Sequence, residues 1–157
     1  KAPDFAYLRP ASLDEAFAAL SLHGDDARIL AGGQTLMALQ NLRMASAEVL
    51  VDINRIPGLS DIREEAGGLA IGALVRHAEV MRSPIVAEHL PLIAEAMPHV
   101  AHMAVRNRGT FGGSIALADP AGAAMFSWFT KGEMSGEGSS ITEGIGVARI
   151  TGNLEGA

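Results

Sequence analysis

The feature that most constrains this chain is a glycine pair placed between a short apolar run and a helical pattern. Residues 27–31 read as a buried strand, Gly32 and Gly33 follow at once, and residues 35–42 repeat apolar side chains at helical spacing. A strand that ends in a glycine turn at the start of a helix presents consecutive backbone amides, and such amides bind phosphate. An ordinary strand-to-helix turn is the alternative interpretation.

A second glycine-rich segment lies at residues 106–114, and the two segments together predict a cradle that holds a dinucleotide from both sides. Its glycines allow close approach of a ligand, its hydroxyl groups donate hydrogen bonds and its arginines offset negative charge; these residues are Gly109, Gly112, Gly113, Thr110, Ser114, Arg106 and Arg108. A β-bulge with solvent-facing arginines is the alternative. The G-x-G-x-x-G fingerprint and the phosphate-loop lysine pattern are both missing, so a standard Rossmann or P-loop site is not expected.

Composition excludes several classes of function. The 157 residues are 48% hydrophobic and 19% charged, which predicts a globular domain with a core. A net charge of −6 argues against a nucleic-acid partner, for which a basic surface is expected. Without cysteine the chain cannot ligate an iron–sulfur cluster or use a thiol nucleophile, so any electron carrier it holds must be organic.

Neither a membrane segment nor a catalytic cluster is expected. There is no run of about 18 apolar residues and no signal-peptide pattern, so a cytoplasmic protein without a membrane span is predicted. His99 and His102 could share a helical face, but no third ligand lies near them and no metal site is predicted. His77 and His89 are expected to be surface or packing residues. No catalytic residue is proposed.

The first part of the chain alternates helix and strand signals in a βαβ-like order. Ser12 and Glu15 form a capping box that predicts a helix ending at Gly24. The strand at 27–31 and the helix at 35–42 follow, and residues 48–53 read as a further strand. Pro57 and Gly58 then close a first lobe at residues 1–57.

The second part, residues 58–120, reads as a sheet with helices. Residues 59–65 and 69–73 predict a β-hairpin, and two helical stretches follow at 76–82 and 84–97, the second with a possible new start at Pro91. Asp119 and Pro120 predict the start of another helix, which Gly132 ends. The glycine-rich residues beyond about 133 are expected to be poorly ordered.

Several segments together resemble one family. These are Phe5 to Ser12, Leu30 to Leu36, Val51 to Asn54, Ile71 to Ala73, Val105 to Ser114 and Ala118 to Pro120. Through them, residues 1 to about 120 resemble the FAD-binding part of the flavin (medium) subunit of molybdenum hydroxylases. That group includes the medium subunits of carbon monoxide dehydrogenases and the flavin domain of xanthine dehydrogenase. The resemblance implies an α+β, two-lobed FAD-binding domain, here truncated and with a foreign C-terminal helix and tail.

The same resemblance implies an oxidoreductase electron-transfer flavoprotein. FAD would receive electrons from iron–sulfur clusters of a partner in a complex that also has a molybdenum subunit, and would pass them to NAD or oxygen. The isolated chain would have no complete activity. The implied FAD-binding residues are Leu30, Ala31, Gly32, Gly33, Gln34, Thr35, Leu36, Thr110, Gly112, Gly113, Ser114 and Asp119.

The end of the chain departs from this pattern. The acidic residue that usually follows the Asp-Pro-Ala block is replaced by Ala123, and residues 121–157 resemble a helix and a glycine-rich segment of cysteine synthase. The chain therefore reads as a chimera with its junction at 118–124. The cofactor lysine and the phosphate loop of that pyridoxal-phosphate enzyme are missing, so its catalysis is not expected. A non-catalytic scaffold that keeps the fold but binds FAD weakly or not at all is the alternative function.

Overall fold

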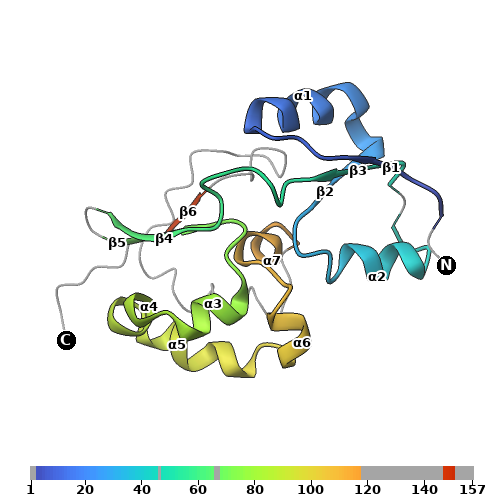
Figure 1. The fold of residues 1–157 in the computed structure, drawn as a ribbon. Helices are drawn as coiled ribbons and strands as arrows, with labels where there is room; N and C mark the ends of the chain where they lie inside the picture. Colours follow the sequence, from blue (N-terminus) through green and yellow to red (C-terminus); the bar gives the residue numbers. More distant parts are fainter. Residues whose placement is uncertain (1–2, 46, 66–67, 118–146, 151–157) are drawn as a thin grey trace. The chain divides into compact units, whose positions relative to one another are not determined.

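The computed structural model describes residues 3–45, 47–65, 68–117 and 147–150. It combines helices with two separate sheets, so the expected α+β class is confirmed (Figure 1). The chain divides into two compact units, Lys1–Pro57 and Gly58–Ala157, at the same position where the sequence predicts the end of the first lobe. Which function each lobe has stays a prediction.

The first unit is a three-stranded parallel sheet with two helices. Its strands run in the order β1 (Ala6–Leu8), β3 (Val49–Asp52), β2 (Ala27–Leu30). Figure 1 shows α1 (Leu13–His23) and α2 (Leu36–Asn41) on opposite sides of these strands, which is the consequence of two crossover connections in opposite directions across one parallel sheet. All four residues of β3 are buried, as expected for the central strand of a sheet covered on both faces.

The ends of α1 follow the predicted capping residues. The Ser12 hydroxyl accepts a hydrogen bond from the Glu15 amide at 3.2 Å, and the Glu15 carboxylate accepts one from the amide of Ala11 at 2.8 Å. The Glu15 side chain thus reaches one residue beyond the cap itself. Gly24 ends the helix with a φ of 49°, a conformation that favours glycine, and a short 3-10 turn, η1 (Gly24–Asp26), leads into β2.

The second unit contains the predicted hairpin and a third strand that was not predicted. β4 (Ile62–Glu65) pairs antiparallel with β5 (Gly68–Gly72), which confirms the hairpin. β6 (Val147–Ile150) pairs antiparallel with the other edge of β5, from Gly72 opposite Val147 to Leu69 opposite Ile150. The expectation of poor order beyond residue 133 is wrong for these four residues. The edge of β5 that does not face β4 carries its own backbone donors and acceptors, which need hydrogen-bond partners. β6, in which two of the four residues are β-branched, provides these partners.

Short helices complete the second unit, and Figure 1 shows α3, α4 and α5 grouped on one side of its sheet. Their bounds are α3 (His77–Arg82), α4 (Pro84–His89), α5 (Pro91–Ala96), η2 (Met97–His99), α6 (Met103–Arg106) and α7 (Phe111–Leu117). The predicted stretch at 84–97 is divided at Leu90, because Pro91 begins α5 and cannot donate a backbone hydrogen bond to α4. The segment at 106–114 includes the start of α7, where the sequence predicts a loop or a bulge.

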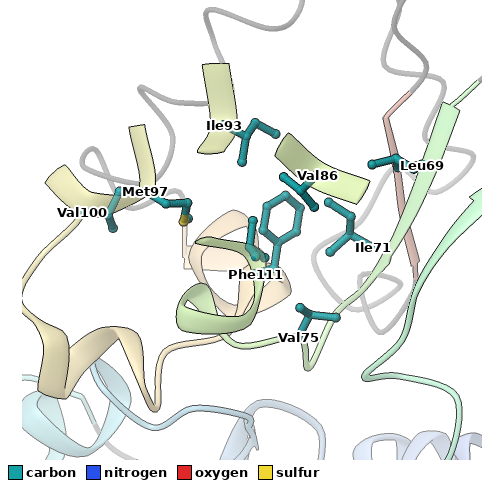
Figure 2. Packing of buried hydrophobic residues seen from close by; sticks show 9 residues of the cluster. Leu69, Ile71, Val75, Val86, Ile93, Met97, Val100 and Phe111 are labelled. Carbon is teal, nitrogen blue, oxygen red and sulfur yellow. The ribbon is translucent and has the colours of Figure 1, made fainter. Parts of the chain in front are cut away.

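Phe111 anchors α7 in the core of this unit. Figure 2 shows its ring among side chains from β5, α4 and the segments before α3 and α6, and the ring is 1% exposed. The nine buried members are Leu69, Ile71, Val75, Val80, Val86, Ile93, Met97, Val100 and Phe111. Burial of one such side chain contributes about 1.5–3 kcal/mol, so Phe111 helps to hold the first turn of α7 against the core.

The predicted helix from Asp119 and most of the glycine-rich tail lie outside the described residues. Among the helices that the structure does describe, none has the length and apolar character needed to cross a membrane.

Candidate cofactor-binding site

The first glycine turn joins β2 to α2 and has a fixed shape. Gly33 has a φ of 67°, and a Cβ added there would lie 3.1 Å from Cδ1 of Leu30 and 3.3 Å from Cγ of Met37. The Gln34 side chain donates to the carbonyl of Gly32 at 3.1 Å. The backbone conformation therefore favours glycine at position 33, and a Cβ there would also need small shifts of the Leu30 and Met37 side chains.

The amides of this turn are available to a ligand. Within the described part of the chain, the backbone N–H groups of Gly32, Gly33, Gln34 and Thr35 donate no hydrogen bond, and all four residues are half-buried. Partly buried amides normally have partners, so a run of four without one suits an anion. The residues present here therefore fit a phosphate group, and that they bind one stays a prediction.

A buried carboxylate lies behind the turn, at the end of β3. Asp52 is 4% exposed and accepts hydrogen bonds from the hydroxyl of Tyr7 and from Asn54, while Nε of Arg9 lies 3.4 Å from its Oδ2. Burial alone would raise the pKa of Asp52, but the hydrogen bonds from Tyr7 and Asn54 and the charge of Arg9 together lower this pKa below 3.8. The same hydrogen bond raises the pKa of Tyr7 above 10.0. Asp52 is thus held as an anion.

The second glycine segment is organised differently, because its amides are used inside the protein. The amide of Phe111 donates to the Val75 carbonyl at 2.8 Å, and the amide of Gly112 donates to the Ala73 carbonyl at 2.9 Å. Thr110, which is 2% exposed, accepts hydrogen bonds from the amides three and four residues on. Its Oγ1 accepts from Gly113 at 3.2 Å and its carbonyl accepts from Ser114 at 3.1 Å. Thr110 therefore caps α7, and the segment is a helix start instead of a β-bulge.

Close packing of α7 against Ala73 explains why residue 112 is a glycine. A Cβ there would lie 2.6 Å from Cβ of Ala73 and 2.9 Å from its carbonyl oxygen. The glycine lets α7 approach the residues after β5. The sequence predicts close approach of a ligand at this glycine, and not close approach of another segment of the protein.

His77 is a buried residue that the sequence analysis did not place at the site. Its Nε2 lies 3.1 Å from the carbonyl oxygen of Thr110 and 3.1 Å from Oγ of Ser114. A carbonyl oxygen can only accept a hydrogen bond, so Nε2 of His77 carries a proton. The hydroxyl oxygen of Ser114 lies beside the same N–H and acts as an acceptor toward it. No local pattern could reveal this contact, because the partners lie 33 and 37 residues away along the chain.

Part of the Arg106 guanidinium is engaged within the protein, and its expected role near an anion stays a prediction. Its Nη1 lies within hydrogen-bond distance of three carbonyls before α6, those of Pro98 in η2 at 3.0 Å, Val100 at 3.0 Å and Ala101 at 2.6 Å. The guanidinium therefore fastens the loop before α6. Arg108 is exposed, and Asp119 lies outside the described residues.

The described residues contain no group of three or more His, Asp or Glu side chains placed to hold a metal ion.

These features define an α+β domain whose first glycine turn has four backbone amides without a partner in the described part of the chain. Residues 3–132 match a family of domains described as the FAD binding domain in molybdopterin dehydrogenase, and the chain belongs to this family. Membership confirms FAD as the cofactor that the sequence predicts. The match extends past the predicted junction at 118–124, and the resemblance of residues 121–157 to cysteine synthase stays a prediction.

Sequence comparison with two relatives supports the family assignment. The chain is 49% identical over 121 residues to the 6-hydroxypseudooxynicotine dehydrogenase complex subunit alpha of Paenarthrobacter nicotinovorans, covering 77% of this chain and 41% of that protein. It is 49% identical over 118 residues to the carbon monoxide dehydrogenase medium chain of Hydrogenophaga pseudoflava, covering 75% and 41%.

The fold agrees as well. A structure of carbon monoxide dehydrogenase from Hydrogenophaga pseudoflava, lacking the Mo-pyranopterin moiety of the molybdenum cofactor, superposes with a TM-score of 0.75 at 49% identity, covering 76% of this chain and 42% of that one. The chain thus spans about two fifths of the length of the curated relatives it matches.

Proposed function

We propose that the chain is the FAD-binding electron-transfer part of a molybdenum hydroxylase flavin subunit. In this role it receives electrons from iron–sulfur clusters of a partner subunit, within a complex that also has a molybdenum subunit, and delivers them to NAD or oxygen in the cytoplasm. The family match over residues 3–132 carries the proposal. The names of the two relatives, a dehydrogenase complex subunit and a medium chain, support the assignment to a multi-subunit enzyme.

The first glycine turn is the best-supported part of the proposed FAD site. Residues 30–36 contribute the four amides without internal partners, and Gly33 shapes the turn that presents them. Backbone N–H groups bind a pyrophosphate without a lysine or arginine, which agrees with the acidic charge of the chain.

The second segment contributes through other groups. Thr110, Gly112, Gly113, Ser114 and Asp119 are the residues we assign to FAD by family resemblance. The amides of 111–114 are already bonded within the protein, so the support here is for the half-buried Ser114 hydroxyl as the donor. Thr110 acts by capping α7, and Gly112 acts by letting α7 pack closely.

The residue types present indicate which roles belong to FAD and which belong to the protein. FAD supplies the redox chemistry when it is bound, and the protein binds and orients it. No residue of this chain is assigned as a catalytic acid, base or nucleophile. The activity of an isolated chain is then limited to artificial reduction of its flavin.

We also propose that residues from about 121 onward are of cysteine-synthase-like origin. Sequence resemblance is the support, and pyridoxal-phosphate chemistry is not part of the proposal. An aldimine absorption band in the purified protein would contradict the absence of pyridoxal-phosphate chemistry.

The proposed function is tested by the colour of the purified chain. A yellow protein that releases FAD on denaturation, at one flavin per chain, is the expected result. Colourless protein that leaves the fluorescence of added FAD unchanged would favour a scaffold without the cofactor.

A further inference from the structure

The side chain of Asn54 reaches across from the end of β3 to the first glycine turn. Its Nδ2 donates to the carbonyl of Ala31 at 2.8 Å and lies 3.3 Å from the carbonyl of Leu30. Asn54 is 23 residues from Ala31 in the sequence, so this is a tertiary contact made at the point where the turn begins.

Asn54 is itself held in place by Asp52. Oδ1 of Asp52 accepts from the backbone amide of Asn54 at 2.9 Å and from its Nδ2 at 2.7 Å. The second carboxylate oxygen is engaged by Tyr7 and Arg9. A carboxylate fixed on both sides holds the asparagine amide in one orientation, in which Nδ2 donates both to Asp52 and to the turn.

Because the peptide unit is planar, the hydrogen bond to the Ala31 carbonyl also sets the direction of the Gly32 N–H. In a trans peptide the carbonyl of one residue and the N–H of the next point in opposite directions. The bond from Asn54 to the Ala31 carbonyl therefore directs the Gly32 N–H away from Asn54. In the same way, the bond from Gln34 to the Gly32 carbonyl sets the direction of the Gly33 N–H.

We infer that Asn54, held by Asp52, is a positioning residue that aims the Gly32 amide at the pyrophosphate of FAD. The inference rests on the proposed function, since it assigns the purpose of a contact behind the same turn. It names a residue outside the glycine segment that controls how the segment binds. A purely structural role, joining the ends of β2 and β3, is the competing account.

Two variants of Asn54 and one control separate these accounts. Asn54→Ala removes the donor, and Asn54→Ser keeps a hydroxyl beside Asp52 but is too short to span to the Ala31 carbonyl. The control is Asn41→Ala, the same chemical change at an exposed position in α2. The measurements are the Kd for FAD, by flavin fluorescence, and the ³¹P resonances of bound FAD at saturation.

Both Asn54 variants are expected to raise the Kd for FAD about tenfold, the effect of misaligning one hydrogen bond to a charged group. They are also expected to shift at least one pyrophosphate ³¹P resonance of bound FAD, whereas Asn41→Ala changes neither quantity. Unchanged ³¹P resonances, or a Kd within twofold of wild type in Asn54→Ser, would overturn the inference. Failure of the wild-type chain to bind FAD would instead overturn the proposed function.

Discussion

The hydroxyl oxygen of Ser114 lies 3.1 Å from Nε2 of His77, a buried imidazole 37 residues earlier in the chain. The same nitrogen donates to the carbonyl of Thr110, the residue that caps α7. One side chain at the start of α3 thus holds both the cap and the first turn of α7.

Replacement of His77 is expected to destabilise the second unit. His77→Ala removes a donor to a buried carbonyl and should lower the free energy of unfolding by about 2 kcal/mol. His77→Gln supplies an amide donor and should restore part of the loss. Urea denaturation measures both, with the exposed His102→Ala as the control that changes stability by less than about 0.5 kcal/mol. Equal stability of His77→Ala and wild type would show that the imidazole contributes nothing to the fold.

A methyl group at position 112 is expected to clash with Ala73. Gly112→Ala places Cβ where the Ala73 methyl carbon is 2.6 Å away, so the free energy of unfolding should fall by about 1–3 kcal/mol. The double variant with Ala73→Gly removes the closest of these atoms, although the Ala73 backbone remains within 2.9 Å. We therefore expect partial recovery and a coupling energy of at least about 0.5 kcal/mol. Strict additivity of the two changes would contradict the packing explanation.

The stability of the first unit is expected to depend on the ionisation of Asp52. Its pKa in the folded protein lies below 3.8, so the native state favours the carboxylate. This contribution is complete above pH 3.8 and is lost as the pH falls through the folded pKa. Asp52→Asn should lower the free energy of unfolding at pH 7 by about 1–3 kcal/mol, and by less near pH 3.

Urea denaturation at the two pH values provides the measurement for Asp52. The exposed Asp25→Asn variant is the control, with a small effect at both. A destabilisation by Asp52→Asn that grows on acidification would mean that the sign of the pKa shift is wrong.

Local sequence signals were sufficient for several individual elements of both units. Ser12 and Gly24 mark the ends of α1 because capping depends on residues within one turn. Pro91 marks the start of α5 for the same kind of reason. The Gly32–Gly33 turn was predicted from its place between a strand and a helix, and in the structure it joins β2 to α2.

Tertiary contacts account for what the sequence could not predict. Gly112 and Gly113 suggest a loop by their helix propensity, but burial of Phe111 and the cap at Thr110 make the segment helical. β6 depends on pairing with a strand about eighty residues earlier, as the register of Leu69 with Ile150 shows. The contact of Asn54 with Ala31 likewise has no local signature.

The central claim, that the first glycine turn holds FAD, is tested most directly by titrating FAD with the chain and with its Gly33→Val variant. A branched side chain at φ 67° is strained and would meet Leu30 and Met37, so the turn cannot keep its shape. The account predicts saturable binding of one FAD per wild-type chain, and a Kd raised at least about tenfold in a variant that stays folded. Equal affinity of the folded variant and the wild type, or no binding by the wild type, would contradict it.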